Sequence, residues 1–455
     1  MSVSNMGGPN MGVTDQLVEL SGLAVDALPA SALEMARFSL FDWMVCARAG
    51  RNEPLSKKFR AFAAAEGGKP FASIVDGSPT SARLAALVNG SISHALDFDD
   101  THFAHIGHLS VGIYPAALAM AEELDLSANA LVEAFLIGAE AAIRLGMVLG
   151  SNHYNHGFHQ TATAGAFGAT IAAGRLLGLT KVQIRHALGL CATRASGLKS
   201  QFGTMGKPYN AGIAASNGVE CAKLAKLDFT SADDAVMGPQ GFVPTHNIAD
   251  IDTTEWPIPT RDAFLFEDNK YKFHACCHGL HAMIEALLKI RTLGAEISNV
   301  EHLEIRTNPR WLKVCDNKSP KTALETKFSY LWLAGMTLRG DTTGDDRLYS
   351  DELARDPQLT EFAERVRVIG DENLSDLQVA GAATLKTGDH VPVEHDLAAK
   401  LPSAKLKQKL RAKAVALLGG EGREIWDNFN RLNTMSAREI GQIIAQGTEV
   451  ATSSG

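Results

Sequence analysis

The sequence is poor in cysteine and in aromatic residues, and it has no excess of basic charge. Its six cysteines among 455 residues show no framework spacing and its start has no apolar secretory segment, so we expect a cytoplasmic protein with reduced thiols. No uncharged run approaches the roughly 20 apolar residues that span a bilayer. A net charge of −8 argues against nucleic acid and anionic membranes as partners and favours a small molecule.

The length and the patterning predict two domains rather than one. Helical patterns rich in alanine and glycine dominate residues 81–188 and 210–227, and small residues let helices pack closely. After about residue 250 a Pro- and charge-rich connector, TTEWPIPTRDAF, leads into a mixed region, and helical patterns return at residue 400. We therefore predict a mainly α fold, in which a large all-helical domain (1–260 and 400–455) carries an inserted smaller α+β domain (261–399).

Strand patterns occur only in the proposed insert. VEHLEIRT alternates Leu303, Ile305 and Thr307 with polar residues and predicts a strand with one buried face. RVRVIGDE predicts a second strand, and VAGAATLKTGDHV predicts a strand, a Thr-Gly-Asp turn and a strand. KFSYLWLAGMTL between them has a helical pattern.

Acids, hydroxyls and imidazoles crowd into HALDFDDTHFAHIGH, residues 94 to 108. The segment lies between two apolar, small-residue runs that are typical of buried helices. Polar groups that are buried without partners lose their hydration, so such density favours a site in a cleft. The alternative is a solvated loop whose acids cap the following helix.

Histidines form three clusters. His102, His105 and His108 have the spacing H-x2-H-x2-H, which recurs in the second cluster, and a third cluster follows near residue 280. Such spacing could direct imidazoles at one metal ion, so a metal-dependent hydrolase is a real alternative, although H-E-x-x-H is absent. Packing explains some histidines equally well, above all His153 and His156 in the turn-like SNHYNHG. The members of the second and third clusters are His153, His156 and His159, and His274, His278 and His281.

Lys207 lies in QFGTMGKPYNAG, where glycines and Pro208 predict a turn that enters a helix. There a lysine can face a substrate carboxylate beside the helix N-terminal amides. An exposed, solvated lysine is the alternative. Histidines, a lysine and acids without a nucleotide-binding loop favour acid–base chemistry on an anionic substrate.

Five segments in order resemble signatures of the MmgE/PrpD family: HALDFDDTH with His108, GFHQTATAGAFGATIAAGRLLGL, TMGKPYNAG, CCHGLHAMIEAL and LETKFS. That family includes 2-methylcitrate dehydratases, cis-aconitate decarboxylases and the epimerase of iminodisuccinate. The resemblance spans nearly the whole chain. It implies a large helical domain, a smaller α+β lid inserted before the C-terminal helices, a homodimer, and catalysis without metal or cofactor.

The family's site positions fall on residues of matching type here, and four neighbouring positions depart from the family pattern. Asn210 stands where a histidine is usual, and Trp332 where a tyrosine is expected. Gln160 replaces a proline, and FHACCHGLH replaces the common PYPCC form. The matching positions are Asp97, Thr101, His108, His159, Lys207 and His281.

The resemblance implies a cofactor-independent isomerase or lyase that abstracts or returns a proton beside a carboxylate of a small di- or tricarboxylate. Because the usual histidine and tyrosine are missing, we favour epimerisation of iminodisuccinate. The alternatives are a 2-methylcitrate-type dehydratase, a cis-aconitate-type decarboxylase, the metal-dependent hydrolase and a non-catalytic carboxylate-binding protein.

Roles follow from the chemistry of each side chain. We expect His108 and His159 to carry protons on opposite faces of one carbon, and Asp97 to set the tautomer or charge of a neighbouring imidazole. Lys207 is expected to anchor a carboxylate. The predicted substrate-binding residues are Thr101, Asn210 and His281, the last reaching in from the lid.

Overall fold

The computed structural model describes residues 12–246 and 264–446, so the connector TTEWPIPTRDAF lies outside the described residues except for Phe264. The chain forms two compact units, Met1–Tyr271 with Leu418–Gly455, and Lys272–Leu417. The predicted fold class is confirmed: the chain is mainly α, with a smaller sheet-bearing unit inserted in the sequence. Within the described residues, no helix is long and apolar enough to cross a membrane.

The bounds of the insert differ from the predicted 261–399 at both ends, since the compact unit begins at Lys272. The sequence places its end at residue 399, whereas the compact unit runs to Leu417 and includes most of helix α17 (Ser403–Leu418). Lys409 of α17 pairs with Glu285 inside this unit. Sequence patterning could not choose between the units, because an amphipathic helix can pack its apolar face against either.

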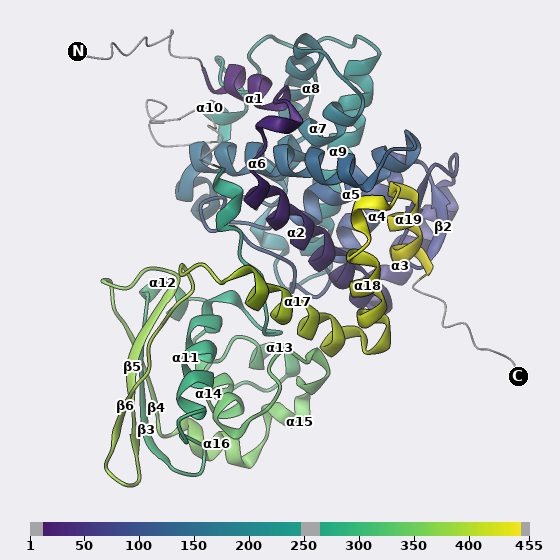
Figure 1. Ribbon diagram of the computed structural model, residues 1–455. Coiled ribbons are helices and arrows are strands. Elements are labelled where there is room, and N and C mark those ends of the chain that lie inside the picture. The colour runs from purple at the N-terminus through teal and green to yellow at the C-terminus, as the bar shows by residue number, and fades with distance from the viewer. Residues whose placement is uncertain (1–11, 247–263, 447–455) are drawn as a thin grey trace, which may run out of the picture. The chain divides into compact units, whose positions relative to one another are not determined.

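The first unit is built around helices with many small residues. Helices α5 and α9 pack against each other and against both α4 and α7, and α6 packs against α7 (Figure 1). The packing is close: a Cβ on Gly90 of α4 would lie 2.8 Å from the Cα of Gly212 in α9. Any larger residue at Gly90 would push these two helices apart. The helices of this unit are α1 (Val13–Ser21), α2 (Ala30–Ala49), α3 (Pro54–Glu66), α4 (Ala82–Ser93), α5 (Ser110–Glu123), α6 (Ala128–His156), α7 (Thr163–Leu176), α8 (Lys181–Arg194), α9 (Gly206–Lys226), α10 (Phe242–His246), α18 (Gly420–Phe429) and α19 (Ala437–Gln446).

The first unit is not wholly helical, which corrects the expected all-helical domain. Strands β1 (Ala72–Ile74) and β2 (Gly77–Thr80) form an antiparallel hairpin. Asp76 at its turn has φ 54°, a left-handed conformation that aspartate tolerates better than most residues. The hairpin is too short to show the alternation that reveals a strand in a sequence.

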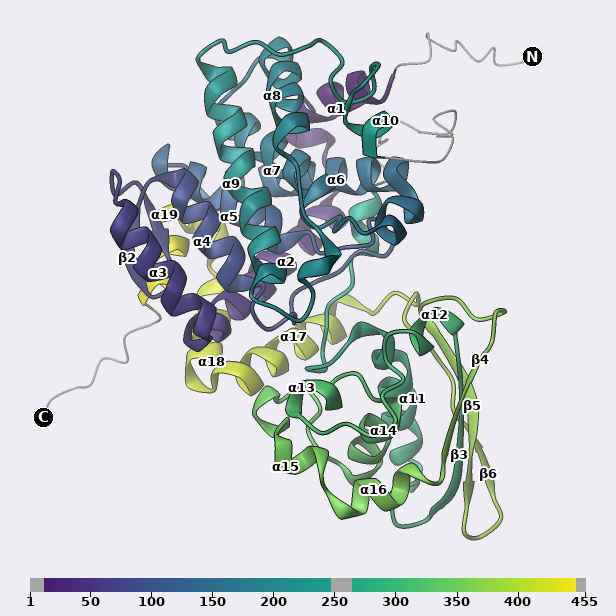
Figure 2. The same cartoon turned by 180° about the vertical axis from the view of Figure 1, so that it is seen from behind.

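The second unit packs helices against one face of a five-stranded sheet, as Figure 2 shows for α11 and α14. The strand order is β4-β3-β5-β6, with β7 also paired to β5. The β3–β4 pair is parallel, and the pairs that β5 makes with β3, β6 and β7 are antiparallel. The predicted strand VEHLEIRT is confirmed as β3, whose Leu303, Ile305 and Thr307 are buried. The elements are α11 (His281–Arg291), β3 (Val300–Thr307), α12 (Pro309–Leu312), α13 (Ala323–Thr326), α14 (Tyr330–Arg339), α15 (Asp351–Ala354), α16 (Pro357–Ala363), β4 (Val366–Gly370), β5 (Gln378–Leu385), β6 (His390–Pro392) and β7 (His395–Asp396).

Candidate active site

The loop between α4 and α5 carries the polar cluster. His94 caps the C-terminus of α4, and the chain then turns through Asp97, whose φ of 52° lies in the left-handed region. Such a conformation costs a non-glycine residue about 1 kcal/mol or more, and residues of this kind concentrate at functional sites. The turn directs Asp97 and Asp99 toward the same group of imidazoles.

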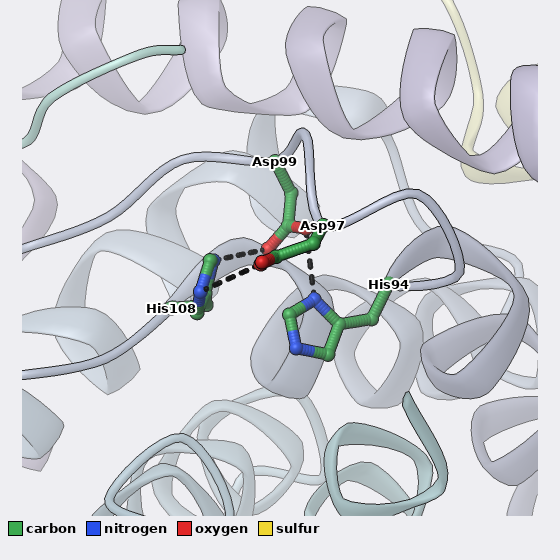
Figure 3. A group of neighbouring side chains, drawn as sticks. All are labelled: His94, Asp97, Asp99 and His108. Carbon is green, nitrogen blue, oxygen red and sulfur yellow. Dashed lines mark hydrogen bonds and ion pairs between the residues drawn. The ribbon is translucent and has the colours of Figure 1, made fainter. Parts of the chain in front are cut away.

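Two carboxylates and two imidazoles meet in this loop (Figure 3). Asp99 Oδ1 lies 2.8 Å from His94 Nδ1, and Asp99 Oδ2 lies 2.7 Å from His108 Nδ1. Asp97 Oδ1 lies 3.3 Å from the other ring nitrogen of His108, Nε2. The His94 and His108 rings meet edge to face, with centroids 4.5 Å apart. His108 thus lies between two carboxylates, with each ring nitrogen within ion-pair distance of one of them.

Burial and charge set the protonation of Asp99 and His94. Burial alone would raise the pKa of Asp99, but the neighbouring His108 and His94 imidazoles hold this pKa well below its usual value. Burial lowers the pKa of His94 to about 4, although Asp99 opposes the shift. At neutral pH Asp99 is therefore ionised, and His94 is neutral with one N–H.

Lys207 brings a positive charge to the same place from the first turn of α9. Its Nζ lies 2.6 Å from Asp97 Oδ1, so Lys207 and His108 both approach one carboxylate oxygen. Phe202 lies beside them: its ring centroid is 5.4 Å from Lys207 Nζ, in cation–π contact, and 5.0 Å from the His159 ring. The Phe202 ring therefore borders the cluster where Lys207 and His159 approach it.

His159 is oriented by Asn210 of α9. The Asn210 amide nitrogen lies 3.2 Å from the Leu198 carbonyl and 3.1 Å from His159 Nδ1. A carbonyl accepts only, which identifies this atom as the donating nitrogen, and His159 Nδ1 accepts its second hydrogen. Burial, followed by Lys207, holds the pKa of His159 well below its usual value. Neutral His159 therefore carries its proton on Nε2.

A second polar group fixes the loop in place. Asp100 accepts hydrogen bonds from the backbone and side chain of Ser110, at 3.1 and 2.5 Å, and from Asn269 Nδ2 at 2.7 Å. Burial raises the pKa of Asp100, against these donors. Thr101 pairs through its backbone with Lys270, with both N–H to O distances at 2.8 Å. Its predicted contact with substrate stays a prediction.

Three histidines of the first two clusters have contacts typical of packing, and a fourth is exposed. His102 Nε2 bonds the Leu265 carbonyl at 2.9 Å, and His105 Nδ1 bonds the Ala142 carbonyl at 3.1 Å. His153 bonds the His246 carbonyl and Thr163 Oγ1, both at 3.0 Å. His156 is exposed. The expected turn at SNHYNHG is wrong, because α6 continues to His156 despite a non-helical Gly150.

The third cluster lies in the second unit. His281 is buried, with its ring centroid 5.0 Å from that of His274 and 4.6 Å from that of His278. His274 is held by Thr343 Oγ1 at 2.7 Å and by Glu285 at 3.2 Å. Trp332, which replaces the expected tyrosine, donates its indole N–H to the Leu353 carbonyl at 3.2 Å. A role for His281 in substrate binding stays a prediction.

The loop cluster also has the donor types of a metal centre. One ligand atom from each of His94, Asp97, Asp99 and His108 lies within 4.8 Å of the others, and these four side chains could hold a divalent cation. Lys207 already places an ammonium group 2.6 Å from Asp97, and a metal ion there would meet strong repulsion. The set fits a cation only if Lys207 moves away from Asp97.

Three residues of this cluster were not selected from the sequence: His94, Asp99 and Phe202. The signal for the first two was present, since both lie in HALDFDD at the end of a buried helix. Spacing alone could not show that Asp99, rather than Asp97, lies beside Nδ1 of His108 and hydrogen bonds the His94 ring. Phe202 lies five residues before Lys207, and no pattern marks its packing on two site residues.

The class of protein is defined by a helical unit that carries this acid–base cluster and by an inserted α+β unit. Comparison with known proteins identifies the family. Residues 19–250 match the MmgE/PrpD N-terminal domain and residues 274–426 match the MmgE/PrpD C-terminal domain. The chain belongs to the MmgE/PrpD family.

Curated relatives include several cis-aconitate decarboxylases. That of Aspergillus terreus is 29% identical over 316 residues, 65% of this chain and 64% of the relative, so the match spans less than two thirds of the relative. The Homo sapiens protein of the same name is 35% identical over 163 residues, which cover 35% of this chain and 34% of the relative. The Mus musculus protein is 24% identical over 303 residues, 62% of this chain and 60% of the relative.

Proposed function

We propose that the chain is a cofactor-independent lyase that decarboxylates a small unsaturated tricarboxylate of the cis-aconitate type. One observation carries the proposal: Lys207 Nζ and His108 Nε2 approach the same carboxylate oxygen, Asp97 Oδ1, at 2.6 and 3.3 Å. The two groups are therefore spaced so that both can contact one anionic oxygen, such as that of a substrate carboxylate. The names of the relatives support the choice of reaction.

The reaction needs a proton donor more than a base. In cis-aconitate one carboxylate sits on a carbon next to the double bond. When that carboxylate leaves as carbon dioxide, the electron pair of the broken C–C bond forms a new double bond. The electrons of the old double bond take a proton at the carbon that bears another carboxylate. Positive charge must meet the negative charge that develops beside that carboxylate.

The cluster supplies these parts. Protonated His108, held between Asp97 and Asp99, is the proton donor. Lys207 binds a substrate carboxylate, and His159 offers its Nε2–H as a further hydrogen-bond donor, because Asn210 occupies its Nδ1. This changes the role expected for His159: in its resting state it donates a hydrogen bond and does not act as a base.

Epimerisation of an iminodisuccinate-like dicarboxylate is the second candidate. It needs proton carriers on two faces of one carbon. The His94 ring neighbours both His108 and His159, with centroids 4.5 and 6.2 Å away, so the two carriers are near enough to serve one small molecule. The replacement of the usual histidine by Asn210 also favours it.

A panel of carboxylates tests the proposal. Chelator-treated protein is incubated with cis-aconitate, 2-methylcitrate and iminodisuccinate, and the mixtures are followed by proton NMR. We expect cis-aconitate to lose carbon dioxide at an undiminished rate after chelation, since Lys207 holds the place of a cation. Epimerisation of iminodisuccinate alone would establish the second candidate, and dehydration of 2-methylcitrate alone would reject both. Activity that needs added zinc or iron would support a metal enzyme instead.

A further inference from the structure

Asp99 contacts two imidazoles, one with each carboxylate oxygen. Of these two imidazoles, only His108 has a role in the proposed chemistry. Oδ2 contacts His108, the proton donor, at 2.7 Å, while Oδ1 contacts Nδ1 of His94 at 2.8 Å. Asp99 and His94 are fully buried. A buried carboxylate needs donors to stay ionised, so the second imidazole has a physical function that the reaction itself does not assign.

The protonation of His94 follows from its surroundings. Neutral imidazole has one N–H, and the carboxylate oxygen at Nδ1 accepts only, so the proton of His94 lies on Nδ1. His94 thus gives Asp99 a hydrogen bond without adding charge. The negative charge of Asp99 remains available to His108.

We propose that His94 is a positioning residue that acts through Asp99: it aligns the carboxylate that holds Nδ1 of His108 and thereby directs Nε2 of His108 toward Asp97 and Lys207. The inference rests on the proposed function in taking His108 as the proton donor. In this proposal the functional atom of His94 is Nδ1. The other ring nitrogen, Nε2, is buried and has no hydrogen-bond partner among the described residues. The competing account is that Nε2 acts on the substrate directly.

Two substitutions separate these accounts, because asparagine and glutamine each keep one of the two ring nitrogens. The amide nitrogen of His94→Asn falls near the position of Nδ1, and that of His94→Gln near Nε2. We expect His94→Asn to keep kcat within about threefold, and His94→Gln to lower kcat about tenfold to hundredfold with little change in KM, as is typical when a supporting hydrogen bond is removed.

The resting protein gives an independent measurement. In wild-type protein labelled with nitrogen-15 in histidine, the chemical shifts should show His94 protonated on Nδ1 and bare on Nε2. His94→Gln should change the ring signals of His108, and His94→Asn should leave them close to wild type. Because this measurement needs no substrate, it stands even if the panel of carboxylates rejects the proposed function.

Three results would overturn the inference. One is wild-type His94 protonated on Nε2. Another is an active His94→Gln variant with an inactive His94→Asn variant, which would show that Nε2 is the functional nitrogen of His94. The third is loss of activity in both variants while the His108 signals stay unchanged.

Discussion

The segments around His102 and His153 have the same H-x2-H-x2-H spacing, and comparing them shows what makes a histidine functional. In each segment the first imidazole bonds a main-chain carbonyl, Leu265 for His102 and His246 for His153. In each, the third imidazole, His108 or His159, joins the polar cluster of the site. Identical spacing therefore produces both structural and site residues.

The difference lies in the partners of the ring nitrogens. A carbonyl partner fixes an N–H on a neutral ring, and burial lowers the pKa of both His102 and His153 to about 4. His108 instead has a carboxylate oxygen near each ring nitrogen, 3.3 Å from Nε2 and 2.7 Å from Nδ1. The chemistry of an imidazole here follows from its partners, which lie far away in the sequence.

The largest expected effect comes from substituting matched histidines of one segment. His108→Gln removes the proposed proton donor and should lower kcat about 10³-fold, within the range for general acid catalysis. His102→Gln keeps a nitrogen that can reach the Leu265 carbonyl and loses only the acceptor for the His105 N–H, at 3.3 Å. It should keep kcat and lose about 1 kcal/mol of stability. Steady-state kinetics with thermal unfolding of both variants checks this.

If both variants turned over at the wild-type rate, His108 would not be the donor. If both lost activity while remaining folded, the division between structural and site histidines would be wrong. Lys207 would become the leading proton carrier in the first case.

A smaller effect is expected from the lysine that faces the cluster. Lys207→Ala removes the charge beside Asp97 and should mainly raise KM, by about tenfold to hundredfold, since a hydrogen bond to a charged group contributes about 1.5–3 kcal/mol. Lys199→Ala is the matched control, because Lys199 packs on the Tyr154 ring at 3.7 Å and bonds its carbonyl. Its KM should stay within about twofold. A collapse of kcat with unchanged KM in Lys207→Ala would contradict the anchoring role.

The smallest effect concerns a buried carboxylate with different partners. Glu122 accepts from Ser73 N and Oγ, at 3.0 and 2.7 Å, and burial raises its pKa to about 7, opposite in direction to Asp99. As pH rises, Glu122 ionises at a lower pH in the unfolded chain than in the folded protein. The contribution of Glu122 to stability therefore falls between about pH 4.5 and about pH 7. Glu122→Gln removes that fall, which amounts to about 3 kcal/mol at most.

Unfolding of wild type and Glu122→Gln at pH 5 and pH 8 measures this. The variant should gain stability relative to wild type between the two pH values. An equal difference at both pH values would show that Glu122 keeps an ordinary pKa, which would remove the contrast with Asp99.

Much of the fold and part of the site could be predicted from the sequence. The alternation of VEHLEIRT identified β3, and small residues identified the close-packed helices, because both signals are local. The same holds for the residue types in HALDFDD. The partners could not be predicted: the left-handed turn at Asp97 decides which carboxylate faces which imidazole, and no spacing rule describes it. The end of the insert at Leu417 depends on packing between distant segments.

The most direct test of the central claim is the position of deuterium after reaction in D2O. If the site donates a proton to the carbon beside a carboxylate, cis-aconitate should give a five-carbon unsaturated dicarboxylate with one deuterium in the CH2 beside the carboxylate and none in the new terminal CH2. NMR and mass spectrometry of the product show both positions. Deuterium at the carbon that lost carbon dioxide, or deuterium exchange into cis-aconitate without loss of carbon dioxide, would contradict the account.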